Sequence, residues 1–385
     1  MLQLCGTLCA KSFIVALAAL AATASFAQSS VQIDGIFDAG FQAINYKGTK
    51  VNGINGNGSS TSQLNIRGTE DLGGGLKADF RVETDWNTVA NKANTGAAST
   101  AVTLGQETVA AASSFANGEI RAGLAGGFGR VDLGAVNYNT LGTYVTGQPF
   151  GTAIGSGFRT FYVNDAQSTS AVRADNAIKY TTPTFNGLNA TLYKSNKQTK
   201  ANASTATATA AAVQQTSYST AMGAYDQQGA QEVGVNYANG PIAASFSNLK
   251  NDYDGVGTSA YTQTVNTAAA KYTFGAASLS GLYQTNKKSD NTVDNKAYSI
   301  SGTYTMGATV LMAQVGELKN NVNSTKSKLW GLGADYNLSK RTALYFRAES
   351  IDDKAGSVQA AMTPATIKGT DTKFARTSIG LRHSF

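Results

Sequence analysis

The sequence predicts an all-β fold: a 16-stranded antiparallel β-barrel that spans a membrane. Three observations lead to this prediction. Segments with one apolar and one polar face recur along the chain, short turns and long polar loops join them alternately, and the last segment ends on an aromatic residue, Phe385. A closed barrel satisfies every backbone group in lipid, so such a chain needs no long apolar helix to cross a bilayer.

Residues 1–27 are expected to form a secretory signal peptide that is cleaved after Ala27. Lys11 supplies the positive charge, 12–24 is an apolar run too short to span a bilayer as a helix, and 25–27 offers a small-residue cleavage site. Both cysteines of the sequence, Cys5 and Cys9, precede this site. The barrel domain, 28–385, is therefore expected to hold no disulfide and no reactive thiol.

The charge balance of the chain is basic. The leader holds one of the 31 basic residues and none of the 24 acidic residues, so the mature chain has a formal net charge of +6. A basic balance often indicates nucleic acid or a membrane surface. Because no Lys/Arg run occurs and the leader predicts export, we expect no nucleic-acid partner and instead a lumen or surface that prefers anions.

The predicted strands are recognised by polarity that alternates at every second residue. In 76–85 one face is apolar or small and the other is charged: Leu76, Ala78, Phe80 and Val82 against Lys77, Asp79, Arg81, Glu83 and Asp85. A charged face of this kind is in contact with water and its opposite face is not. The predicted strands are 31–46, 61–70, 76–85, 117–126, 130–138, 174–182, 187–197, 231–238, 241–250, 266–274, 276–286, 294–306, 307–319, 326–338, 341–352 and 372–385.

The connections between these strands differ on the two sides of the barrel. Short turns are predicted at 126–127, 183–187, 239–241, 275, 307 and 339–340, and long loops at 87–117, 139–173, 195–230 and 352–371. Short periplasmic turns and long external loops are typical of outer-membrane barrels. A two-domain soluble β protein would have to bury the charged faces, whereas a cylinder of 16 strands is wide enough for an aqueous channel.

Aromatic residues mark the face that we expect to lie in lipid. Outward Phe and Tyr residues form a lipid face and girdle in this interpretation, unless some pack between subunits: Phe37, Phe41, Tyr283, Tyr298, Tyr304 and Tyr336.

The last strand carries Leu381, His383 and Phe385 on its apolar face. This ending resembles the C-terminal assembly signal of bacterial outer-membrane proteins; the alternative is an ordinary edge strand. His383 is the only histidine, so a catalytic triad or histidine metal site would have to use it, and its place beside the chain end favours assembly instead. We therefore expect no catalytic site, no metal and no cofactor.

Several segments together resemble the general-diffusion porins of Gram-negative bacteria, especially those of β-proteobacteria. They are 67–78 (RGTEDLGGGLKA), 122–124 (AGL), 128–134 (FGRVDLG), 173–188 (RADNAIKYTTPTFNGL) and 379–385 (IGLRHSF). The similar segments extend from the start of the mature chain to its end, with gaps at the loops. They are specific in combination and weak singly.

The resemblance implies a homotrimer of barrels, each with a pore that the third external loop, about 139–172, narrows by folding inward. It also implies the constriction residues Pro149, Phe150 and Gly151, which are similar to a Pro-Glu-Phe-Gly motif of the family but lack its Glu. The implied partners are lipopolysaccharide and outer-membrane lipid, the β-barrel assembly machinery and periplasmic chaperones, and small hydrophilic solutes and ions. Two further departures are Gly118 and Gln63, where relatives often carry Arg.

A basic wall of the pore is expected from Arg67, Arg81 and Arg121, which alternation places inward on three consecutive strands. Guanidinium groups stay ionised and can align in a wet wall. Opposite this wall, the constriction loop carries Arg159 and Asp165. In the alternative interpretation, the strand arginines form solvated ion pairs with Asp79, Glu83 and Glu119. Because the loop lacks the family's Glu, we expect a weak anion preference.

The leading functional hypothesis is passive diffusion of small hydrophilic solutes and ions through the outer membrane. A solute-specific porin and an adhesin that displays its loops remain alternatives. A barrel enzyme, such as a phospholipase or protease, would need a set of His, Ser and Asp residues that this chain does not offer.

Overall fold

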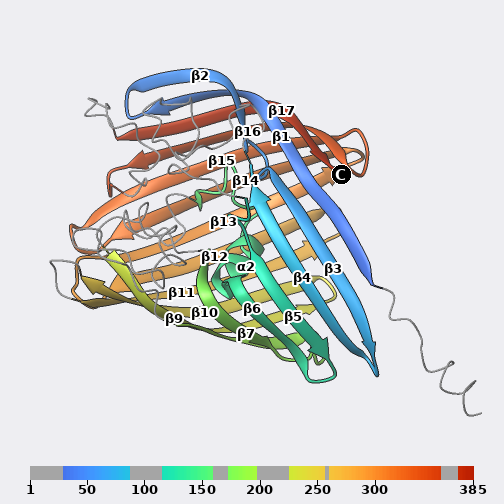
Figure 1. The fold of residues 1–385 in the computed structure, drawn as a ribbon. Coiled ribbons are helices and arrows are strands. Elements are labelled where there is room, and N and C mark those ends of the chain that lie inside the picture. Colours follow the sequence, from blue (N-terminus) through green and yellow to red (C-terminus); the bar gives the residue numbers. More distant parts are fainter. Residues whose placement is uncertain (1–28, 87–114, 159–171, 197–224, 256–259, 357–371) are drawn as a thin grey trace, which may run out of the picture.

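A computed structural model describes residues 29–86, 115–158, 172–196, 225–255, 260–356 and 372–385. Most of these residues lie in antiparallel strands that belong to one sheet (Figure 1). The predicted leader and two of the predicted loop residues, Arg159 and Asp165, lie outside the described residues. Within the described ranges, no helix has the length and apolar character needed to cross a membrane.

The strands and the one described helix follow each other along the chain in the order β1 Ser30–Tyr46, β2 Thr49–Gly56, β3 Gln63–Gly73, β4 Leu76–Asp85, β5 Ile120–Gly126, β6 Gly129–Asn137, α2 Asn139–Thr146, β7 Arg173–Thr181, β8 Leu188–Ser195, β9 Tyr225–Asn239, β10 Ile242–Gly255, β11 Tyr261–Phe274, β12 Ala277–Lys288, β13 Asp294–Met306, β14 Thr309–Asn320, β15 Thr325–Asn337, β16 Thr342–Asp353 and β17 Lys373–Ser384.

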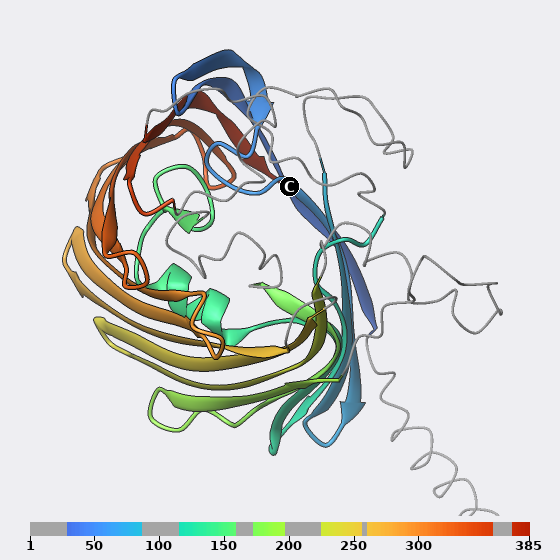
Figure 2. The ribbon, with the colours of Figure 1, turned by 90° about the vertical axis from the view of Figure 1, so that its left-hand side faces the viewer.

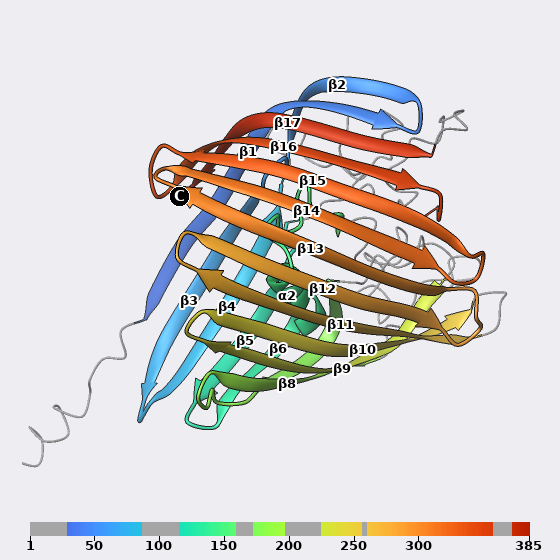
Figure 3. The ribbon, with the colours of Figure 1, turned by 180° about the vertical axis from the view of Figure 1, so that it is seen from behind.

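The first and last strands close the sheet into a barrel. β1 pairs with β17 from Ile36↔Ser384 to Tyr46↔Phe374. On its other edge, β1 pairs with β3 in its first half and with β2 in its second half. β2 and β3 therefore share one position in the wall, and the result is the closed 16-stranded antiparallel barrel that the sequence predicts. Figure 3 shows the tilted strands of this wall from outside.

Each of the 16 predicted strands has its counterpart, and the differences lie at the long-loop ends. β9, β10 and β11 extend beyond the predicted 231–238, 241–250 and 266–274, because their outer ends are polar and lose the apolar alternation that marks a strand. β2 was not predicted. It is rich in Gly and Asn, which are depleted in strands, and it forms through a tight turn in which Lys47 and Gly48 have φ of 49° and 103°.

The two faces of the wall have opposite polarity. Large apolar side chains are exposed on the outside, such as Val31 (71% exposed) and Ile379 (66%), where they face lipid. All six aromatic residues that were predicted to point outward are exposed there: Phe37, Phe41, Tyr283, Tyr298, Tyr304 and Tyr336. Small polar residues and many charged residues, such as Glu232 and Glu349, occupy the inward positions.

The helix α2 and the segment after it lie inside the ring of strands (Figure 2). α2 packs against β9, β10 and β11. Its Tyr144 and the following Phe158 join a buried apolar cluster with wall residues such as Leu249, Val265 and Leu282. Apolar burial against the inner wall therefore holds the third external loop in the lumen, which the family resemblance had implied.

Candidate functional site

Arg67, Arg81 and Arg121 form one row across three neighbouring strands of the inner wall. Arg67 on β3 is the direct register partner of Arg81 on β4, and Arg81 is the partner of Arg121 on β5. Alternation points all three side chains into the lumen. The structure places these three residues at one level of the barrel.

Carboxylates accompany every arginine of this row. Arg67 Nε lies 3.0 Å from Asp34 Oδ2. Arg81 binds Glu83 at 2.6 Å and Glu119 at 2.9 Å. The ion pairs that the alternative interpretation proposed are therefore present.

The row continues onto β5 and β6. Arg121 Nη1 lies 2.5 Å from Asp79 and 3.0 Å from Asp132. Arg130, which the sequence analysis did not select, binds the same two carboxylates at 2.7 and 2.5 Å. Its signal was present in the sequence, because Arg130 and Asp132 alternate inward in the segment that resembles the porins.

We call these nine residues the arginine network: Arg67, Arg81, Arg121 and Arg130 with Asp34, Asp79, Glu83, Glu119 and Asp132. Its acids outnumber its arginines by one. The wall is therefore a mixed-charge surface, in which the arginines of the expected basic wall also form the ion pairs of the alternative interpretation. Gly118 adjoins it, since a side chain there would overlap Glu83.

The predicted constriction residues lie in the part of the third loop that crosses the lumen. Phe150 is 2% exposed, and Gly151 takes a left-handed conformation with φ of 60°, which favours glycine. Gln148 closes this turn: its Nε2 donates to the Gly151 carbonyl at 2.7 Å, and its Oε1 accepts from Phe150 N–H at 2.6 Å. Gln148, the residue before Pro149, therefore maintains the shape of this turn.

Two buried carboxylates of the wall anchor the loop. Glu232 on β9 accepts hydrogen bonds from the backbone N–H groups of Asn139 (2.5 Å) and Thr140 (2.7 Å) at the start of α2. An anion is favourable at this end because the first N–H groups of a helix have no partner within it. On β16, Glu349 accepts from Gly155 N–H at 3.0 Å and Gly157 N–H at 2.9 Å. Sequence patterning marked neither residue.

Further contacts fit the loop to the wall. A side chain at Gly331 on β15 would overlap the carbonyl oxygen of Gly155, so only glycine leaves room for the backbone there. The Arg347 guanidinium lies 5.9 Å from the centre of the Phe150 ring. Tyr144 donates its hydroxyl proton to the Ser156 carbonyl at 2.5 Å. Burial raises the pKa of Tyr144 far above its usual value, so the phenol stays a donor.

A second segment, 57–62 between β2 and β3, also turns into the lumen. Asp38 on β1 accepts hydrogen bonds from the backbone N–H groups of Gly58 (3.0 Å) and Ser59 (2.9 Å). Thr61 in this segment contacts Thr152 of the third loop at 3.3 Å between hydroxyl oxygens. We call 57–62 the inner segment. The sequence of this segment does not predict its inward fold, because Gly, Asn and Ser residues are equally typical of an exposed loop.

The residues of the predicted assembly signal lie at the seam of the barrel. Leu381 and Phe385 are 39% and 40% exposed on the outside, as alternation predicted. Phe385 N–H donates to the Gly35 carbonyl of β1 at 3.1 Å. His383 Nδ1 lies 2.9 Å from the Thr342 hydroxyl. No cluster of His, Cys, Asp and Glu suited to a metal ion occurs in the described part of the chain.

Comparison with known proteins places this architecture in a family. The model of the Gram-negative porin family matches residues 15–356. The chain is 32% identical to outer membrane porin protein 32 of Delftia acidovorans, over 97% of this chain and 100% of that protein. Its structure is similar to that of the anion-selective porin from Comamonas acidovorans, with a TM-score of 0.71 and 26% identity over 93% of this chain and all of that one.

A more distant structure supports the fold alone. The trimer form of OmpT, an outer-membrane protein of Vibrio cholerae, has a TM-score of 0.61 at 16% identity and covers 93% of this chain and 99% of its own. The closed 16-stranded barrel, the loop folded into its lumen and the match along most of the sequence agree with each other. The chain belongs to the Gram-negative porin family, and it is an integral protein of the outer membrane that forms a diffusion channel.

Proposed function

We propose that the channel carries small hydrophilic solutes and ions passively and prefers anions weakly. The observation that carries this proposal is the row of Arg67, Arg81 and Arg121, which faces the lumen across from the anchored loop. The related porin of Comamonas is described as anion-selective. The preference is weak in this chain because carboxylates pair with each arginine of the row.

Reversal potentials in a KCl gradient across planar bilayers test the proposal. The expected result is a small potential of the sign that anion permeation produces, and a clear cation preference would contradict the proposal. Conductance with a panel of sugars, phosphates and organic acids separates a general channel from a solute-specific one. A barrel with no conductance would favour the adhesin alternative.

We further propose that the protein is a homotrimer and that subunits meet on the outer faces of β1 and β3–β5. These strands form the straighter side of the ring in Figure 2. Within the bounds of these strands, the outward residues include exposed Phe37, Phe80 and Ile120 but no Tyr or Trp, and exposed Trp86 directly follows β4. By contrast, β12–β15 expose Tyr298 and Trp330 within the strands, which suit a lipid interface. Phe80→Cys is expected to crosslink between subunits with a bifunctional thiol reagent, and Leu332→Cys is not. Equal crosslinking of both variants would contradict this interface.

Lysines on the outer face near the long loops support lipopolysaccharide as a neighbour. Lys296, Lys319 and Lys326 are direct register partners on β13, β14 and β15 and are exposed. Val315 and Trp330 lie on the same outward face, nearer to the short turns. The lysines therefore lie between the external loops and an apolar surface that suits acyl chains. We propose that this row contacts phosphates of lipopolysaccharide. Replacing all three with Gln should lower the lipopolysaccharide that copurifies, and the inward Lys271→Gln should not; equal amounts would contradict the contact.

We also propose that Leu381, His383 and Phe385 are read by the β-barrel assembly machinery after periplasmic chaperones deliver the chain. This proposal rests on the exposed outward face of β17 and on its position at the seam with β1.

A further inference from the structure

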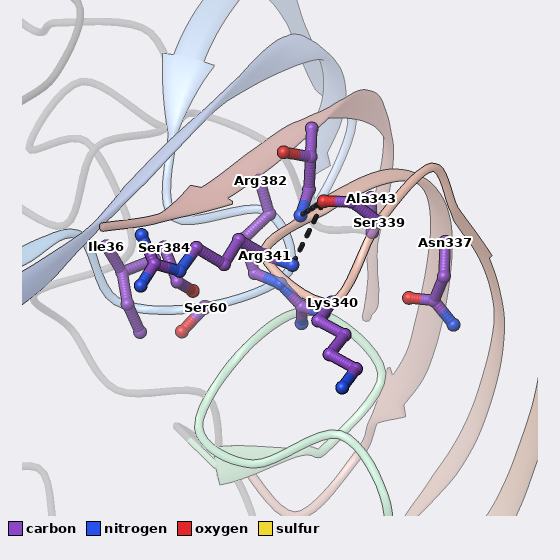
Figure 4. Close-up of a pocket in the computed structure, with 10 residues that line it drawn as sticks. Ile36, Ser60, Asn337, Ser339, Lys340, Arg341, Ala343, Arg382 and Ser384 are labelled. Atoms are coloured by element: carbon purple, nitrogen blue, oxygen red, sulfur yellow. Dashed lines mark hydrogen bonds between the residues drawn. The ribbon is translucent and has the colours of Figure 1, made fainter.

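A small cavity opens at the short-turn end of the lumen. It has a volume of about 140 Å³. Its ten lining residues come from β1, the inner segment, the β15–β16 turn and β17 (Figure 4): Ile36, Ser60, Asn337, Ser339, Lys340, Arg341, Thr342, Ala343, Arg382 and Ser384. Ile36 and Ser384 lie on one side of the turn in Figure 4, and Asn337 on the other.

The charge of this cavity is entirely positive. Lys340, Arg341 and Arg382 contribute three cations, and the lining contains no Asp or Glu. This composition contrasts with the arginine network, in which each guanidinium has a carboxylate within 3.0 Å. The cavity is therefore a place in the described lumen where cations gather without matching acids in the lining.

The carboxylates beside this cavity, Asp38 and Asp335, leave most of this charge uncompensated. Asp38 accepts hydrogen bonds from the backbone N–H groups of Ser59 and Ser60, both at 2.9 Å. Asp335 lies 3.8 Å from Arg382 Nη2 but only 2.8 Å from Arg347 Nη1, so it pairs mainly with Arg347. Within the described ranges, Lys340 and Arg341 form no ion pair. Three like charges near one cavity repel each other, and an anion between them would relieve that repulsion.

The backbone of the turn is fixed although its cationic side chains are exposed. The Ser339 hydroxyl accepts hydrogen bonds from Arg341 N–H at 3.1 Å and Thr342 N–H at 3.0 Å. Leu338 N–H donates to the Thr342 carbonyl at 2.9 Å and closes the turn. A rigid turn holds Lys340 and Arg341 at the mouth, so little backbone ordering is required when an anion binds.

We propose that this cavity is an anion-binding site at the periplasmic mouth and that it takes small multivalent oxyanions such as inorganic phosphate. The inference rests on the proposed channel function and adds to it a second position, besides the arginine row, at which anions interact with the lumen. Arg341 supplies a planar fork that matches phosphate oxygens, and Lys340 supplies a point charge. An anion that enters from the periplasm would be held at this mouth before it reaches the constriction, and an anion that leaves would be held there after it has passed the constriction.

Single-channel recording in KCl with inorganic phosphate at neutral pH on one side tests the site. Phosphate on the short-turn side is expected to reduce the chloride current at lower concentration than phosphate on the loop side. In the double variant Lys340→Gln/Arg341→Gln, we expect the apparent affinity from the short-turn side to fall about tenfold, because two unit charges near the anion are lost. The matched control is Lys271→Gln, an exposed inward lysine of β11 near the same end of the barrel.

The outcomes separate this inference from the proposed function. Unchanged phosphate block in the double variant, or an equal loss in Lys271→Gln, would overturn the site even if the channel prefers anions. Side-dependent block that disappears only in the double variant would support the site even if the reversal potential shows no anion preference. Wild-type conductance in plain KCl shows that the double variant has folded and inserted.

Discussion

The buried carboxylate of Glu349 is predicted to keep the third loop still, and Glu349→Gln should release it. Both Gly155 N–H and Gly157 N–H donate to one oxygen of Glu349, and Arg376 Nη2 lies 2.8 Å from the other oxygen. The substitution keeps the size of the side chain, removes its charge and replaces one of its two acceptor oxygens with an NH2 group. It therefore weakens the two bonds to the loop without creating a cavity.

The size of the effect follows from the two hydrogen bonds. A hydrogen bond to a charged group contributes about 1.5 to 3 kcal/mol and a neutral one about 0.5 to 1.5 kcal/mol, so each bond loses about 1 to 1.5 kcal/mol. The loop would then be held about 2 to 3 kcal/mol less strongly, and its detached population would rise about 30- to 150-fold.

Single-channel recording measures this change directly. We expect Glu349→Gln to show brief, frequent current fluctuations that the parent channel lacks, with a shorter residence in the fully open state. Glu317→Gln is the matched control, because Glu317 is an outward-facing carboxylate paired with Lys326 at 2.7 Å and does not contact the loop. Quiet recordings from a folded Glu349→Gln channel, or equal fluctuation in both variants, would refute the anchoring role.

Three further predictions concern the network, the wall and the seam. Asp79→Asn leaves Arg121 and Arg130 with less compensation, so we expect the anion-to-cation permeability ratio to rise about twofold in 0.1 M salt; a fall in the ratio from the reversal potential would contradict the network. Gly331→Ala should lower the temperature at which the oligomer dissociates in gel electrophoresis, because its methyl group would overlap the Gly155 backbone, whereas Gly281→Ala, with no atom closer than 3.9 Å, should not; equal shifts would count against the fit of loop and wall. Phe385→Ala should reduce the folded protein in outer-membrane fractions more than Leu338→Ala, and equal yields would reject the assembly signal.

Much of the barrel could be predicted from the sequence because successive side chains of each strand face lipid and water in turn. This alternation fixed both the strands and the direction of side chains such as Arg81 and Phe80. Tight turns with glycine gave the register of most hairpins. Alternation did not predict the parts of strands that extend beyond the membrane. The outer ends of β9–β11 do not contact lipid, so they need no apolar face.

The candidate site could be predicted only in part. Alternation placed Arg67, Arg81 and Arg121 in the lumen, but it carries no information on which acids face them across strands. Contacts between segments far apart in sequence, such as Glu349 with Gly155 and Asp38 with Gly58, depend on how the third loop and the inner segment fold back. Residues of this kind look like ordinary polar positions of a strand until the tertiary structure is known.

The anchoring of the third loop has a mechanical consequence for the barrel. Glu232 on β9 and Glu349 on β16 hold two ends of one covalent segment, and these strands lie well apart around the wall. A wide, thin-walled cylinder with a water-filled interior flattens easily under lateral pressure from the bilayer. A cross-brace between distant points of its circumference resists that flattening, so the loop that narrows the pore also keeps its cross-section open.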